Sequence, residues 1–247
     1  MRAGHSFTKG FQRPFDNIFM ESIQETAKYL CENIENVKFS YQQSDEISLL
    51  LTDYDNINTQ AWFNKNLQKM CSIAASMATL EFNRAFERNY NLWKSKAFPT
   101  SYLGHLNAPI TSNEVTLLET YSKAMNKGAL FDARAFVLPR EEVCNYFIWR
   151  QNDCTRNSIQ MVAQSCFSHK ELQGKSCNEL QNMLLTKKDI NWNNFSVPEK
   201  RGSCCAKTQI ETILDSRTGQ EKNRLKWCID HNIPIFKENR EYIESLI

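Results

Sequence analysis

The sequence has no long apolar run and little glycine or proline. It lacks any stretch of about 18 consecutive apolar residues, so it contains no transmembrane helix. The opening residues, Met1 to Ser6, do not include the apolar segment of a secretory signal peptide. With 7 glycines and 6 prolines among 247 residues, collagen-like, linker-like and Gly-rich phosphate-loop proteins are all disfavoured.

Basic and acidic residues are nearly equal in number, and the cysteines form no zinc-binding motif. The 30 basic and 28 acidic residues leave a net charge of +2, which neither demands nor forbids a nucleic-acid partner. The nine cysteines include no C-x-x-C pair for zinc, and Cys204 and Cys205 are adjacent, too close to bridge each other. We therefore expect reduced thiols in a cytoplasmic protein rather than a disulfide framework.

What is present is a globular composition. Hydrophobic residues make up 41% and charged residues 23% of the chain, with 15 Phe, 8 Tyr and 5 Trp. This composition excludes wholesale disorder. The length suits one elaborated domain or two small ones, and it is sufficient to bury a sizeable core.

The hydrophobic pattern predicts a helix and then a β-hairpin near the start of the chain. Asp16 can cap a helix that runs to about Asn33, because apolar residues recur there at helical spacing. Val37 to Tyr41 alternates apolar and polar residues, and Ile47 to Leu51 is an apolar run. These two segments are predicted to be strands joined by an acidic turn.

Further elements follow in the order helix, strand, helix. The pattern predicts a long helix over 61–89, a strand over 130–138, a second long helix over 141–167, and two short helices that begin at the capping boxes of Ser168 and Ser176. Residues 91–128 are poorly patterned and are interpreted as an insertion, and 189–207 as extended and turn structure. With one further strand ahead of residue 17, this order gives an α/β (α+β) core with an antiparallel sheet. Residues 1–8 are too few to form that strand.

The acidic turn of the hairpin is the first candidate site. Asp45 and Glu46 follow Ser44 and lie between the two apolar strands. Adjacent residues at a strand end point to opposite faces, so only one of the two carboxylates can face a given site. One carboxylate, with another from a neighbouring strand, is enough protein ligand for Mg²⁺ that is also held by phosphates, and a pair of such ions promotes nucleotidyl transfer. Acidic residues are also ordinary in turns, and a plain turn is the alternative interpretation.

Polar and basic residues farther along form two weaker candidates. Arg150, Asp153 and Asn157 are spaced to share one face of the second long helix, which also suits a salt-bridged surface face. The pairs Lys187–Lys188 and Lys200–Arg201 could contact phosphates or simply be solvated.

Six motifs follow one another along the chain: Phe7–Asp16, Tyr41–Glu46, Phe131–Arg134, Trp149–Asn157, Lys200–Gly202 and Ile233–Phe236. Taken in this order, they resemble those of the tRNA-His guanylyltransferase family. The resemblance is closer to the family's bacterial-type members, the guanylyltransferase-like 3′-to-5′ RNA polymerases that repair tRNA 5′ ends. It spans nearly the whole chain, apart from about 91–128.

The resemblance implies a fold, an activity and partners. The fold would be a polymerase-palm or nucleotide-cyclase-like antiparallel sheet with helices on one face, plus a C-terminal helical extension. Residues 1–140 would form the catalytic core, and 141–247 would complete that core and the RNA-binding surface. The activity would be addition of nucleotides to the 5′ end of tRNA after ATP activates the 5′ phosphate. Partners would be tRNA, ATP and GTP, in a homo-oligomer, a tetramer, away from membranes.

The resemblance also implies roles for individual residues. Asp45 and Glu46 would be catalytic, and Asp45 with the Met1 carbonyl would bind two Mg²⁺ ions. The incoming nucleotide would be held by Arg2, His5, Arg13, Asp16 and Ser44. The activating nucleotide or the RNA 5′ end would be held by Arg134, Arg150, Asp153, Asn157, Lys187, Lys188, Lys200 and Arg201. Arginine suits these roles because its planar fork pairs bidentately with phosphate.

The sequence departs from the family pattern in two places, and these departures leave alternative functions open. The family's opening strand and first metal-binding Asp would lie ahead of Met1, so either the chain starts too late or the protein has lost its two-metal site. The family's His position for tRNA-His recognition is Thr155, which resembles the repair-type members. The alternatives are therefore an inactive RNA-binding palm and, on the shared fold alone, a nucleotide cyclase-like enzyme.

Overall fold

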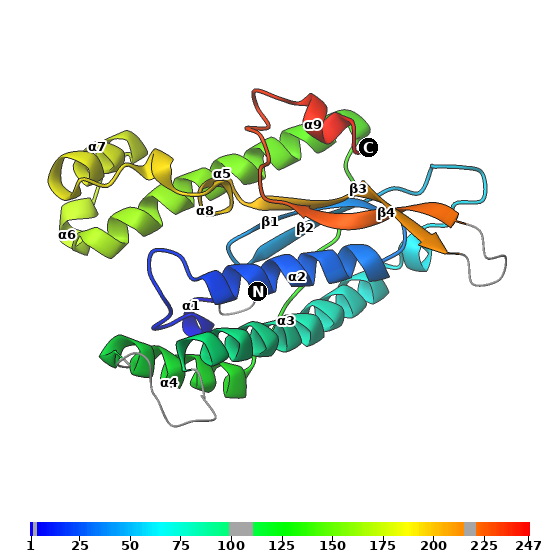
Figure 1. Cartoon of the computed structure of the whole chain (residues 1–247). Coiled ribbons are helices and arrows are strands. Elements are labelled where there is room, and N and C mark those ends of the chain that lie inside the picture. Colours follow the sequence, from blue (N-terminus) through cyan, green and yellow to red (C-terminus); the bar gives the residue numbers. More distant parts are fainter. Residues whose placement is uncertain (2–3, 99–110, 215–220) are drawn as a thin grey trace.

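A four-stranded antiparallel sheet forms the centre of the protein, with helices on both faces (Figure 1). The computed structural model describes residue 1 and residues 4–98, 111–214 and 221–247. The strands are β1 (Val37–Gln43), β2 (Glu46–Leu51), β3 (Ser203–Leu214) and β4 (Glu221–Asp230), in the spatial order β2-β1-β3-β4. This antiparallel α+β architecture confirms the predicted fold class.

The expectation of helices on one face only is wrong. α2 (Asn17–Asn33) and α3 (Leu67–Ala97) lie on one side of the sheet, and α5 (Arg140–Cys166) lies on the other (Figure 1). On the α5 side, Phe39 of β1 packs against Phe147 with ring centroids 4.6 Å apart. Side chains of β1 are buried on both faces, and a strand buried in this way needs cover from both sides.

Several predicted elements are confirmed nearly residue for residue. Asp16 is the N-cap of α2, where its carboxylate accepts a 2.9 Å hydrogen bond from the Phe19 amide. The hairpin and the second long helix form as expected. The capping boxes of Ser168 and Ser176 begin α6 (His169–Leu172) and α7 (Cys177–Lys188). The remaining short helices are α1 (Gly4–Phe7), η1 (Trp62–Lys65), η2 (Trp192–Asn194), α8 (Val197–Arg201) and α9 (Glu241–Glu244).

The described parts of residues 91–128, which were interpreted as a poorly patterned insertion, are helical and packed. The helix α3 continues to Ala97, and α4 (Ser112–Lys127) packs against it. Tyr121 of α4 is 1% exposed and lies within an aromatic cluster that includes Phe11 and Phe86. The segment is therefore part of the core, while residues 99–110 lie outside the described structure.

The predicted strand over 130–138 is extended but does not join the sheet. Apart from an isolated bridge at Leu130, the described residues 131–139 form no ladder. Within the described chain, β2 pairs only with β1 and is an edge strand. A channel of about 1140 Å³ separates its free edge from residues 131–138. Side chains of α3 and α5 line the two sides of this channel.

Only the start of β3 falls within a segment that was expected to be extended, 189–207, and β4 was not predicted. The first residues of β3, Ser203 to Ala206, are all buried, so they show no alternation of apolar and polar residues. They pair with β1, so the N-terminal hairpin and the C-terminal strands form one sheet.

No helix in the described ranges is long and apolar enough to cross a membrane.

Candidate active site at the acidic hairpin

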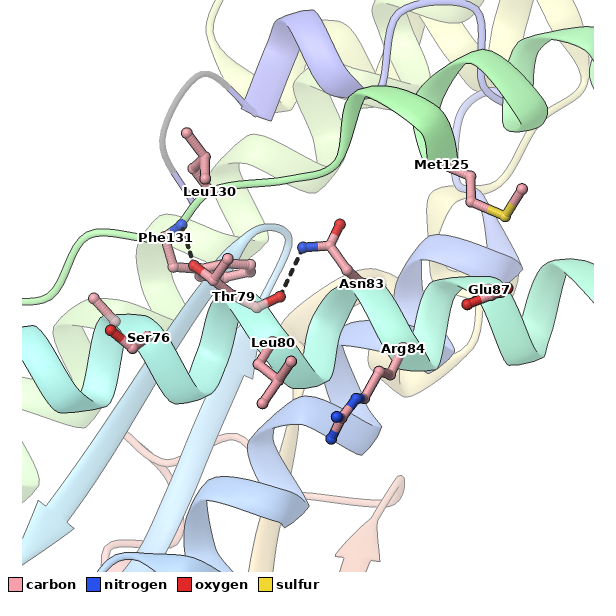
Figure 2. Close-up of a pocket in the computed structure, with 10 residues that line it drawn as sticks. Ser76, Thr79, Leu80, Asn83, Arg84, Glu87, Met125, Leu130 and Phe131 are labelled. Carbon is pink, nitrogen blue, oxygen red and sulfur yellow. Dashed lines mark hydrogen bonds between the residues drawn. The ribbon is translucent and has the colours of Figure 1, made fainter.

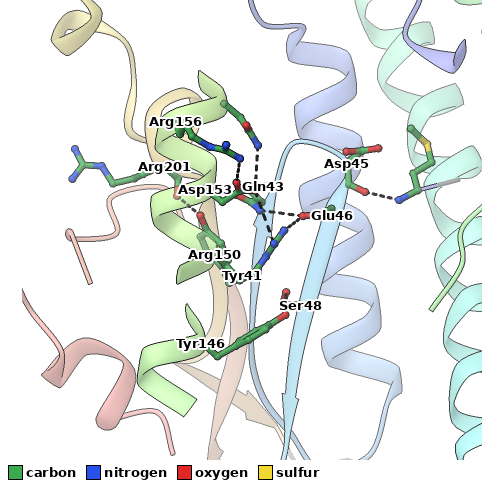
Figure 3. A network of polar contacts seen from close by, with 12 residues as sticks. Tyr41, Gln43, Asp45, Glu46, Ser48, Tyr146, Arg150, Asp153, Arg156 and Arg201 are labelled. Carbon is green, nitrogen blue, oxygen red and sulfur yellow. Dashed lines mark hydrogen bonds and ion pairs between the residues drawn. The ribbon is translucent and has the colours of Figure 1, made fainter. Parts of the chain in front are cut away.

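The hairpin between β1 and β2 presents Asp45 at its tip. Gln43 pairs with Glu46 in register, so Ser44 and Asp45 form a two-residue turn, and Ser44 has a φ of +46°. The Met1 amine donates a 2.8 Å hydrogen bond to the backbone oxygen of Asp45 (Figure 3). In the described structure, no hydrogen bond or ion pair engages the Asp45 carboxylate, so it is available to a ligand.

Glu46 points away from Asp45 and enters a chain of alternating charges. Its carboxylate pairs with the Arg150 guanidinium and accepts a 3.1 Å hydrogen bond from the Gln43 amide. Arg150 also lies 3.9 Å from Asp153, which accepts a 2.5 Å hydrogen bond from Arg156. Figure 3 shows this network running from the hairpin onto α5. The predicted grouping of Arg150, Asp153 and Asn157 on one face holds, since Asn157 donates to Asp153 at 3.2 Å.

A second contact between the hairpin and α5 lies one helical turn before the first. The hydroxyls of Ser48 and Tyr146 are 3.0 Å apart. Neither residue stood out in the sequence, because the contact depends on the register between a strand and a helix 98 residues apart.

Tyr41 connects the same strand to the Lys200–Arg201 motif. Its hydroxyl donates a 2.7 Å hydrogen bond to the Arg201 carbonyl, and burial, followed by the neighbouring Cys154, raises the pKa of Tyr41 well above its ordinary value. Burial also raises the pKa of the Cys154 thiol to about 11. The next residue, Gly202, has a φ of +80°, and a Cβ there would lie 2.3 Å from the Gln42 carbonyl oxygen. The chain can approach the sheet this closely because residue 202 is a glycine.

The channel beside β2 gathers a further subset of the predicted residues. Met1, Asp45, Arg134 and Arg150 all line it, together with Trp149, which is 59% exposed. Arg134 itself is exposed. The structure therefore brings the Asp45 carboxylate, an exposed guanidinium and an aromatic ring to one opening.

Two other predicted nucleotide-binding residues, Arg13 and Asp16, do not line the channel. The buried Asp16 carboxylate is occupied within the protein by the amides of Gln12 and Phe19 and by the Tyr121 hydroxyl. Arg13 is exposed. Arg2 lies outside the described residues, and His5 belongs to α1, but its side chain is also outside the description.

The predicted basic pairs do not line the channel, and one of their lysines is engaged within the protein. Lys187 and Lys188 are exposed at the end of α7, which lies at the opposite end of α5 from α9 (Figure 1). Lys200 donates a 2.6 Å hydrogen bond to the Asn193 carbonyl and lies over the Trp192 ring. Burial, followed by Arg201, lowers the pKa of Lys200.

A second cavity, of about 610 Å³, lies along α3 (Figure 2). Polar residues that line it bond α3 to the segment after α4. Asn83 donates to and accepts from the backbone of Ala129, at 2.9 and 2.8 Å. The Thr79 hydroxyl accepts a 3.0 Å hydrogen bond from the Phe131 amide. These polar groups fix the segment after α4 to α3.

The acidic tip fits a metal held mainly by its substrate. Mg²⁺ commonly takes one or two protein carboxylates and completes its shell with phosphates and water. Asp45 supplies one unpaired carboxylate, whereas Glu46 is engaged by Arg150 and Gln43. Among the residues that the structure describes, no cluster of three His, Cys, Asp or Glu side chains could hold a metal.

Comparisons with known proteins show which family the chain resembles. The model of a family described as tRNAHis guanylyltransferase matches residues 2–139. A probable tRNA(His) guanylyltransferase from Dictyostelium discoideum is 22% identical over 263 residues, covering 99% of this chain and 87% of the relative. A bacterial tRNA(HIS) guanylyltransferase (Thg1)-like protein in complex with ATP superposes with a TM-score of 0.75 at 40% identity, over 99% of this chain and 86% of that one. Such a protein in complex with GTP has a TM-score of 0.70 at 37% identity, over 99% and 84% of the two chains.

The antiparallel sheet, its acidic hairpin and these similarities define a nucleotidyltransferase with a palm-like fold. The match to the family model covers more than half of the sequence. The chain belongs to the tRNA(His) guanylyltransferase family, which confirms the resemblance found in its motifs.

Proposed function

We propose that the protein adds nucleotides in the 3′-to-5′ direction to the 5′ end of tRNA, after ATP activates the 5′ phosphate. The observation that carries the proposal is the Asp45 carboxylate, unpaired at a hairpin tip and facing a channel that Arg134 also lines. Membership of the family and the similarity to proteins solved with ATP and with GTP support it.

The reaction consists of two nucleotidyl transfers. In the first, an oxygen of the RNA 5′ monophosphate attacks the α-phosphorus of ATP, and pyrophosphate leaves. In the second, the 3′ hydroxyl of the incoming nucleotide attacks the activated 5′ phosphorus; AMP leaves and the hydroxyl proton is lost. Both steps develop negative charge on phosphoryl oxygens, which cationic groups stabilise.

Asp45, with the Met1 carbonyl, would hold the two predicted Mg²⁺ ions together with the triphosphate. Bound there, the metal would neutralise charge on the attacking and leaving oxygens. Ser44 supports this proposal through its place in the turn, which fixes the backbone beside Asp45. Arg134 lines the same channel and would meet a triphosphate there.

The RNA would be held by basic residues outside the channel. Lys187 and Lys188 are exposed at the end of α7, and Lys200 and Arg201 lie beside β1. Contacts of this kind position RNA without reading its sequence. We propose that the substrates are 5′-truncated tRNAs in general, that the protein works as a cytoplasmic homotetramer, and that pairing with the opposite acceptor strand selects the added base.

The second candidate is an RNA-binding palm without activity. The small number of available metal ligands favours this candidate, because the described residues supply a single unpaired carboxylate at the tip, that of Asp45. Such a protein would bind tRNA and leave its length unchanged.

The test is extension of 5′-monophosphorylated tRNAs that lack their first nucleotide, with ATP and all four nucleotides. We expect tRNA-His and non-His tRNAs to gain one nucleotide at comparable rates, and omission of ATP to stop the reaction. A preference for tRNA-His above roughly a hundredfold, or about 2.7 kcal/mol, would favour a dedicated guanylyltransferase instead. Binding without extension of any tRNA would favour the inactive palm.

A further inference from the structure

Arg150 is held inside the protein by three contacts. Its side chain is only 12% exposed and pairs with the Glu46 carboxylate, while Asp153 lies 3.9 Å away. The guanidinium also lies over the Trp149 ring, 4.8 Å from the centroid. Two carboxylates therefore neutralise this cation before any substrate arrives.

We infer that Arg150 is a positioning residue for the acidic hairpin and does not contact phosphate. It acts through Glu46, the residue next to Asp45, and fixes the tip of the hairpin to α5. This inference rests on the proposed function only in taking Asp45 as the working carboxylate.

The geometry of the helix and the strand supports this role. Arg150 lies four residues after Tyr146 in α5, and Glu46 lies two residues before Ser48 in β2, so each pair shares one face of its element. Four helical residues rise about 6 Å, and two strand residues advance about 6.6 Å. Because these distances match, the two contacts fasten β2 along the side of α5.

Glu46 connects the hairpin to α5 through its carboxylate. Its carboxylate meets both Arg150 and the amide of Gln43, which is itself only 4% exposed. The Gln43 amide oxygen is buried without a partner among the described residues, so this amide is held through its contact with Glu46. Loss of Glu46 would leave the confined guanidinium with Asp153 alone, at 3.9 Å, and would take away the partner of the buried Gln43 amide, and such under-paired groups destabilise their surroundings.

The charges around Arg150 also argue against phosphate binding. An incoming phosphate would meet Glu46 and Asp153 beside the guanidinium, so it would have to displace a carboxylate that is already in place. Arg156, at the outer end of the same network, is different, because its side chain is 59% exposed. It provides a matched arginine on the same helix.

The experiment combines Arg150→Gln, Glu46→Gln and the double variant, with Arg156→Gln as the matched control. Hydrogen exchange of the amides of residues 44–48 should accelerate at least about tenfold in each single variant and no further in the double variant, because the two residues act as a unit. The control should leave this exchange within about twofold of the parent. If Arg150→Gln fails to fold, Arg150→Lys keeps the charge and tests the same coupling.

Two further measurements separate positioning from phosphate binding. The slope of log affinity for tRNA against log salt should be unchanged in Arg150→Gln, whereas loss of a phosphate contact would reduce it by about one. In the extension assay, kcat should fall at least about tenfold while KM for tRNA stays within about twofold. A reduced salt slope with unchanged exchange at the tip would overturn the inference. If no tRNA is extended but the exchange effects are coupled, the proposed function fails and the positioning role stands.

Discussion

The Tyr121 hydroxyl donates a 2.6 Å hydrogen bond to the Asp16 carboxylate and so joins α4 to the N-terminus of α2. Both residues are buried, and burial, followed by Asp16, raises the pKa of Tyr121. The same carboxylate caps α2. Asp16 therefore has a complete structural role, and α4 completes the core around it.

Removing this hydroxyl should lower stability measurably. We expect Tyr121→Phe to lower the free energy of unfolding by about 1–2 kcal/mol, because a charged acceptor loses a buried donor. Tyr90→Phe is the control within the same cluster, since the Tyr90 hydroxyl has no hydrogen-bond partner among the described residues. Urea unfolding measures both variants. Equal losses would show that the bond to Asp16 contributes nothing.

Gly202 offers a test of how the Arg201 motif is seated. Gly202→Ala should lower the free energy of unfolding by about 3 kcal/mol. The new methyl would lie 2.3 Å from the Gln42 carbonyl oxygen, and the positive φ of residue 202 disfavours alanine. Gly174→Ala is the matched control, with a φ of +74° and no atom within 4 Å of the added Cβ. In that variant, backbone strain alone should lower the free energy of unfolding by about 1 kcal/mol. Thermal unfolding of both variants gives the comparison, and similar losses would contradict the close approach to β1.

Local signals in the sequence were enough for part of the fold and the site. Asp16 and the capping boxes at Ser168 and Ser176 determine where helices begin, because their hydrogen bonds span only three residues. The turn at Ser44 and Asp45 was predictable for the same reason. The partners of Asp16 and Arg150 were not, since Tyr121 and Glu46 are separated from them by about a hundred residues.

Long-range pairing also explains the errors in the sheet. The start of β3 is buried without alternation because its side chains are covered on both faces of the sheet, Cys204 in the cluster with Phe147 and Cys205 in the cluster with Leu30. Residues 130–138 alternate like a strand, but pairing depends on a neighbour at the correct distance. A channel lies there instead.

The edge of β2 that has no partner among the described strands leads to a prediction about strand addition. An unpaired edge beside an apolar channel favours association between molecules. Adding about a dozen strand-forming residues ahead of Met1 should increase solubility and nucleotide addition, because a strand continuing from Met1 can pair with β2. A Gly/Ser-rich extension of equal length is the control. High solubility and full activity of the unextended 247-residue chain would contradict this prediction.

The role of Asp45 can be separated from its part in the fold. Its carboxylate makes no contact within the described structure, so Asp45→Asn and Asp45→Ala should unfold at nearly the parent temperature. Asp53→Asn is the matched control, because Asp53 also lines the channel but is paired with Lys65 at 2.5 Å.

The rate of single-nucleotide addition to a 5′-truncated tRNA by Asp45→Asn tests the central claim most directly. The proposed role predicts a loss of at least about a hundredfold, because removal of one carboxylate from a metal-dependent transfer is not compensated by water. Binding of tRNA should change by less than about twofold, and Asp53→Asn should keep the parent rate. Addition by Asp45→Asn within a few fold of the parent rate would show that the hairpin carboxylate is not the working group.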